Sequence, residues 1–162
     1  SEEVPFRWMT GTQSHESMAG TLAAIEHIAW LGRVISTKEL SRREALSVAF
    51  CGIEEYESEL CWNMIQGLKK IDRLKIWGVT DLSMKKHRAP TVSFTHPSMT
   101  AEQIGSALAE EGIFAWAGNF YALELSEALG LEPEGALRVG LLHYNTAEEV
   151  DRFIEVLSEI LA

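Results

Sequence analysis

An arginine near the end of the chain is the residue whose type and setting best suit the binding of a carboxylate. In residues 137–141 apolar residues alternate with Arg138 and Gly140, which predicts a strand with one buried side and the arginine on the other. A guanidinium offers two coplanar N–H donors that match a carboxylate, and Gly140 leaves room beside it. Taken alone, Arg138 is more simply explained as a partly exposed strand residue on a solvated face.

A second candidate site lies near the N-terminus, where Gly11 and Thr12 come just before or at a predicted helix start. Free amides, the positive end of the helix dipole and a hydroxyl together suit an anion. The simpler alternative, which the residues alone favour, is that Thr12 or Ser14 only caps the helix.

The elements that position these residues can be read from periodicity. The first helix carries Met18, Leu22, Ile25 and Ala29 and is predicted to close around Gly32, and a long helix is expected from about Lys38 to Lys69, with Tyr56 completing its apolar stripe. Strands are expected at residues 74–79, 90–95, 113–117 and 137–141, and shorter helices after Thr100, at residues 122–129 and after Thr146. Capping-box spacing relates Thr100 to Gln103 and Thr146 to Glu149.

This order of elements predicts an α/β fold, in which a small mixed β-sheet has helices packed on one face and a helical segment precedes it. We expect a division between residues 1–34, a helix belonging to a larger body, and residues 35–162, a small α/β domain.

Composition excludes several functional classes. The 162 residues are 46% apolar and carry a net charge of −10, which argues against a nucleic-acid partner. The longest apolar runs are too short to span a bilayer. The histidines are too scattered for zinc, and no metal is expected. Cys51 and Cys61 fall ten residues apart on one predicted helix, about 15 Å, so they cannot pair, and we expect a cytoplasmic protein with reduced thiols.

The run Leu-Arg-Val-Gly-Leu-Leu-His-Tyr-Asn-Thr-Ala-Glu-Glu-Val-Asp, residues 137–151, resembles the C-terminal motif of the class V aminotransferase and cysteine desulfurase family. These are fold-type I enzymes that use pyridoxal phosphate (PLP). The resemblance implies that Arg138 holds the α-carboxylate of an amino-acid substrate. It also implies that Gly11 and Thr12 reach the PLP phosphate of the neighbouring subunit in a homodimer, although Met9 stands where the family usually has glutamate.

The resemblance covers only the C-terminal portion of a family member, and the family's PLP lysine lies upstream of that portion. It therefore implies a fragment of a PLP-dependent transferase or lyase that is not catalytic alone and binds no PLP by itself. In residues 118–122 Tyr121 occupies the place of the nucleophilic cysteine of some desulfurases, which argues against desulfuration by that route. Three roles stay open for Tyr121: lining the substrate pocket, packing in the core, or anchoring the loop.

A different class of function stays open. The chain could be a non-catalytic α/β module that binds an amino acid for regulation or mediates dimerisation, in which case Gly11 and Thr12 are only a helix cap. A cofactor lysine upstream in the parent reading frame would favour the enzyme.

Overall fold

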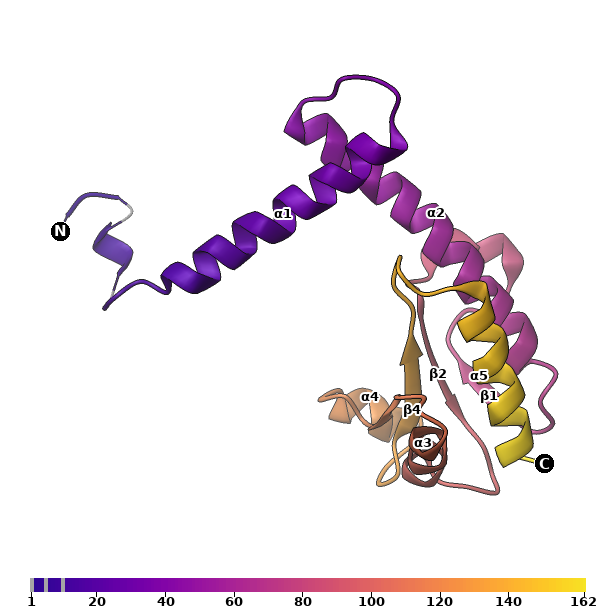
Figure 1. Cartoon of the computed structure of the whole chain (residues 1–162). Coiled ribbons are helices and arrows are strands. Elements are labelled where there is room, and N and C mark those ends of the chain that lie inside the picture. The colour runs from indigo at the N-terminus through magenta and orange to yellow at the C-terminus, as the bar shows by residue number, and fades with distance from the viewer. Residues whose placement is uncertain (1, 5, 10) are drawn as a thin grey trace. The chain divides into compact units, whose positions relative to one another are not determined.

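The computed structural model describes residues 2–4, 6–9 and 11–162, which form two compact units, residues 1–53 and 54–162 (Figure 1). The division falls inside the long helix α2, Arg42–Leu68. The boundary expected near residue 34 separates the end of a larger domain from the small domain. The two compact units do not test that boundary, so it stays a prediction. None of the helices in the described part of the chain combines the length and apolar character needed to cross a membrane.

The first unit contains the short 3-10 helix η1, Phe6–Trp8, the helix α1, His15–Ile35, and the beginning of α2. The helix α1 was predicted to close around Gly32, but it continues through this residue and ends three residues later, at Ile35. Gly32 instead lets the two helices touch: a side chain there would overlap the backbone carbonyl of Ala45. Ala29 and Ala45 are fully buried at this crossing.

The second unit is built on a four-stranded sheet in the order β1-β2-β4-β3. Its strands are β1 (Lys75–Trp77), β2 (Thr91–Thr95), β3 (Trp116–Gly118) and β4 (Ala136–Gly140). The expected α/β class is confirmed, but every pairing in the sheet is antiparallel, so the sheet is not mixed. The 3-10 helix η2, Leu82–His87, connects β1 to β2.

The sequence predicted a mixed sheet, and the position of β4 explains why it is not one. Because β2 and β3 are both antiparallel to β4, they run in the same direction, with helix α3 (Ala101–Glu110) joining them. This crossover leaves a gap one strand wide, and β4 enters it from the opposite direction.

One face of the sheet carries the hydrophobic core. Val92 and Phe94 of β2 and Leu137 of β4 are fully buried there against the end of α2, α3 and the closing helix α5 (Ala147–Ile160). Both expected capping boxes are confirmed, Thr100 with Gln103 at α3 and Thr146 with Glu149 at α5. The short helix α4, Leu123–Ala128, lies in the connection from β3 to β4.

Candidate functional site

A row of four residues crosses the sheet face opposite the core. Strand register places Trp77 against Ser93, Ser93 against Arg138, and Arg138 against Trp116. Because side chains alternate along a strand, the burial of Leu137 on the core face directs Arg138 to the other face. The helices that build the core therefore leave the arginine half-buried on the open face.

The guanidinium of Arg138 lies over an aromatic ring. Its central carbon is 4.1 Å from the centroid of Phe120. In the described part of the chain, Arg138 forms no ion pair and its side chain makes no hydrogen bond. Since the N–H groups of the Arg138 side chain have no partner among the described residues, they can donate to a planar anion such as a carboxylate.

The turn that supplies Phe120 has an unusual backbone. Gly118 has φ 128°. Phe120 and Tyr121, which follow in the same turn, have φ 56° and 62°, in the left-handed region that favours glycine. Each such non-glycine residue costs roughly 1–2 kcal/mol. Asn119 holds the turn, because its Oδ1 accepts from the Tyr121 amide at 3.2 Å and its Nδ2 donates to Glu132 at 3.2 Å. Strain of this kind gathers at binding and catalytic sites.

Tyr121 is 98% exposed, so core packing is not its role. Its backbone amide donates to Asn119, and among the residues that the structure describes its side chain has no hydrogen-bond partner, so the side chain does not anchor the loop there. The expectation that it lines a substrate pocket stays a prediction. The sequence analysis did not single out Phe120. The one sequence feature that pointed to it as a site residue was its position beside Tyr121.

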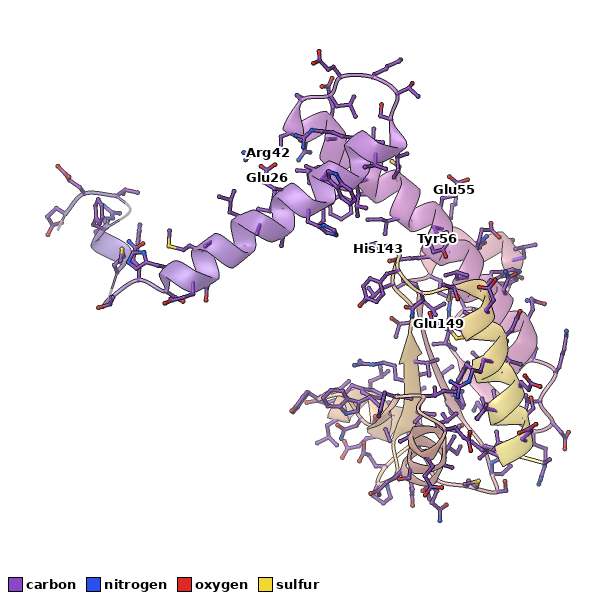
Figure 2. The ribbon with its side chains drawn as sticks, in the orientation of Figure 1. Glu26, Arg42, Glu55, Tyr56, His143 and Glu149 are labelled. Atoms are coloured by element: carbon purple, nitrogen blue, oxygen red, sulfur yellow. The ribbon has the colours of Figure 1, made fainter. Side chains whose placement is uncertain are left out.

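The loop that follows β4 is held by the long helix. The Tyr56 hydroxyl donates to the carbonyl of Asn145 at 2.7 Å, and His143 Nδ1 lies 3.8 Å from a carboxylate oxygen of Glu57. Figure 2 labels Tyr56 on α2 and His143 in the loop. The sequence placed Tyr56 in the apolar stripe of α2, but it is 43% exposed and acts through its hydroxyl. This contact holds the loop that follows β4, the strand that carries Arg138.

Asn145 links this loop to α5. Its side-chain oxygen accepts from the Leu142 amide at 2.9 Å, and its amide nitrogen donates to Glu149 at 3.1 Å. Glu149 also accepts from the backbone N–H of Thr146 at 2.9 Å. These two bonds, the backbone one first, lower the pKa of Glu149 below its usual value, because they stabilise the charged form.

Gly11 and Thr12 are exposed and precede α1, whose N-cap residue is Ser14. The Ser14 side chain makes no capping bond and donates to the Ser17 hydroxyl at 2.7 Å instead. A side chain at position 11 would meet no atom within 4 Å, so the described residues do not themselves require glycine there. The uncapped first turn and the Thr12 hydroxyl are a donor set that fits a phosphate oxygen.

The cysteines are both free, as expected, with Cys51 exposed and Cys61 buried on α2. Burial raises the pKa of the Cys61 thiol, and the nearby Arg88 and Lys85 charges offset this only in part. Cys61 is therefore a poor nucleophile. No cluster of metal-binding side chains exists within the described residues.

A cavity of about 520 Å³ opens beside β1, lined by Lys75, Trp77, Thr95, the loop 96–100, the start of α3 and the connection from α4 to β4. The Lys75 ammonium lies 3.6 Å from the centroid of Trp77. Arg138 and Tyr121 do not line this cavity, although Trp77, which does, belongs to the same row of residues as Arg138.

Comparison with known proteins gives a consistent picture. The Aminotransferase class-V family model matches residues 2–153. An aminotransferase-like protein of Gibberella zeae, FGM3, is 37% identical over 113 residues, covering 67% of this chain and 27% of its own length. A cysteine desulfurase of Serratia proteamaculans is 28% identical, covering 98% of this chain and 33% of the relative.

Solved structures agree on the fold. The cysteine desulfurase CsdA of Escherichia coli superposes with a TM-score of 0.73 at 22% identity, covering all of this chain and 35% of that one. An apo cysteine desulfurase of Thermococcus onnurineus gives a TM-score of 0.65 at 26% identity, covering 74% of this chain and 28% of that one. The chain thus spans about a third of the length of the relatives it matches.

Proposed function

The chain belongs to the aminotransferase class-V family, and on that premise we propose that it is the C-terminal part of a PLP-dependent enzyme acting on an amino acid. Arg138 binds the α-carboxylate of the substrate, and Tyr121 lines the substrate pocket. Gly11 and Thr12 contact the phosphate of PLP held by the partner subunit of a homodimer. In this proposal residues 1–34 end the cofactor-binding domain and residues 35–162 form the small domain.

One observation carries the proposal: Arg138 stands on the open sheet face, with its guanidinium over the Phe120 ring and without a carboxylate partner among the described residues. Other arginines of the described residues donate hydrogen bonds within the fold, Arg88 to the carbonyls of Val79 and Thr91 and Arg152 to the carbonyl of Glu111. The net charge of −10 supplies ample partners, and Arg42 does pair with Glu26. An unpaired, oriented guanidinium is suited to an external carboxylate.

When bound, PLP supplies an electron sink for the substrate amino acid. The lysine that attaches it comes, in this proposal, from outside these residues. An amine that attaches PLP needs a desolvated setting. Lys85 is paired with Glu59, and the other lysines of the chain are exposed. These exposed lysines are Lys38, Lys69, Lys70, Lys75 and Lys86.

Transamination or elimination fits the chain better than desulfuration through a cysteine of this domain. Tyr121 stands at the position of that cysteine, and a phenol, with an ordinary pKa near 10, cannot take up sulfur as a persulfide. Cys61 is buried, and Cys51 lies on α2 in the other unit.

The test compares Arg138→Ala with Arg43→Ala, an exposed arginine on α2, in the intact PLP-loaded protein. We expect Arg138→Ala to weaken amino-acid binding roughly tenfold to hundredfold, the value of a charge-assisted pair, while PLP affinity changes little. Arg43→Ala should change neither. Equal loss of amino acid and PLP would refute the role of Arg138. Failure of the intact protein to take up PLP would favour the non-catalytic module.

A further inference from the structure

The largest side chain next to Arg138 across the sheet is Trp116. It lies directly opposite Arg138 on β3, the edge strand, and it is 64% exposed. Side chains directly opposite in an antiparallel pair have Cβ atoms about 4.5–5.5 Å apart. A small molecule whose carboxylate meets the guanidinium therefore has Trp116 as the neighbouring residue on the edge-strand side.

The surroundings of Arg138 are asymmetric. On the β2 side its partner is Ser93, a small polar residue, and on the β3 side it is Trp116. Phe120 supports the guanidinium from the turn beyond β3. Apolar aromatic surface thus adjoins the arginine directly on the edge-strand side, whereas on the other side Ser93 separates it from Trp77.

Charge on the same face favours a ligand with one carboxylate. Lys75, also on this face, belongs to β1 at the far edge of the sheet, where its ammonium lies over Trp77. The Arg88 guanidinium donates to the carbonyls of Val79 and Thr91. Among the described residues no second cation neighbours Arg138 in its row, so a further acidic group on the ligand would find no partner there.

We propose that Trp116 is a specificity-determining residue and that the acid bound by Arg138 carries an aromatic or similarly large apolar side chain, which packs on the Trp116 indole. This inference rests on the proposed role of Arg138 and adds the class of side chain. Burial of the indole against such a group removes apolar surface from water, which favours large apolar acids over small ones.

The experiment titrates the chain with two acids, 3-phenylpropanoate and propanoate, and with 3-phenylpropanamide, which lacks the charge. Nuclear magnetic resonance follows the indole N–H of Trp116 and the Nε–H of Arg138. We expect 3-phenylpropanoate to bind roughly tenfold more tightly than propanoate and to shift both signals. The amide should bind more weakly than the acid of the same size.

Variants separate the two roles. Trp116→Ala should reduce the preference between the acids to about twofold or less, and Trp116→Phe should keep most of it. Trp30→Ala, which removes an exposed tryptophan from α1, is the matched control and should leave the preference unchanged. Arg138→Lys should weaken both acids by a similar factor, because the carboxylate contact is common to them. Thermal unfolding of each variant checks that the fold is intact.

The outcomes are distinguishable. Equal affinity of the wild-type chain for both acids, with both lost in Arg138→Ala, would overturn the inference while leaving the proposed function intact. Acid binding that does not depend on Arg138, or no binding of either acid, would overturn both. If Trp116→Ala weakened the two acids equally, the indole would not distinguish their side chains, and the inference would fail.

Discussion

The guanidinium carbon of Arg138 lies 4.1 Å from the ring centroid of Phe120, a residue with a left-handed backbone. The two residues come from different places: Arg138 from the central strand β4, and Phe120 from the turn after the edge strand β3. The strained backbone of the turn puts the ring under the guanidinium. The arginine is thereby oriented without a carboxylate partner of its own.

Replacement of Phe120 tests this orientation. Phe120→Gly removes a strain of about 1 kcal/mol and also a cation–π contact worth about 0.5–1 kcal/mol at an exposed site. We therefore expect the free energy of unfolding, measured with urea, to change by less than about 1 kcal/mol. Propanoate affinity should fall about two- to fivefold because the guanidinium is less well oriented. Phe120→Tyr, which keeps the ring, is the control, and unchanged affinity in Phe120→Gly would show that the ring is dispensable.

Gly32 and Gly20 form a matched pair on α1. A side chain at Gly32 would overlap the Ala45 carbonyl, whereas one at Gly20 would meet no atom within 4 Å. We expect Gly32→Ala to cost about 1–3 kcal/mol by overpacking, and Gly20→Ala to stabilise the helix by up to about 1 kcal/mol. Urea unfolding followed by circular dichroism at the helix band measures both. Equal gains in the two variants would contradict the close crossing of α1 and α2.

The Tyr56 hydroxyl can be removed alone. Tyr56→Phe deletes its bond to the Asn145 carbonyl, and we expect a loss of about 0.5–1.5 kcal/mol in the free energy of unfolding. Amide hydrogen exchange should quicken at Leu142 and Thr146, whose N–H groups are bonded within this loop. The control is Tyr144→Phe, because in the described part of the chain the Tyr144 hydroxyl makes no hydrogen bond. Similar effects of both substitutions would count against the Tyr56 contact.

The two cysteines should differ sharply in reactivity. Because burial raises the pKa of Cys61, its thiol stays protonated at pH 7–8, and the reactive thiolate is scarce and shielded. We expect the native chain to react at one thiol, Cys51, with a second released only by guanidinium unfolding. Absorbance after addition of an aromatic disulfide reagent counts them. Cys51→Ser should abolish native labelling and Cys61→Ser should preserve it, so rapid labelling of native Cys51→Ser would restore Cys61 as a candidate nucleophile.

The sequence by itself determined the local elements of this protein. Alternation in residues 137–141 predicted the strand and the outward direction of Arg138, and the spacing of Thr100 with Gln103 and of Thr146 with Glu149 predicted two helix starts, all of which the structure contains. Such features depend on periods of two to four residues, which neighbouring residues dictate.

Only the tertiary structure decided which residues surround Arg138. Ser93, Trp116 and Phe120 are brought to it by the insertion of β4 between β2 and β3, a pairing of segments 18 or more residues distant in the chain that no local period encodes. The role of Gly32 likewise depended on the approach of a second helix, and that of Tyr56 on a loop 89 residues away. Local spacing fixes how a segment folds, whereas long-range packing fixes what each side chain meets.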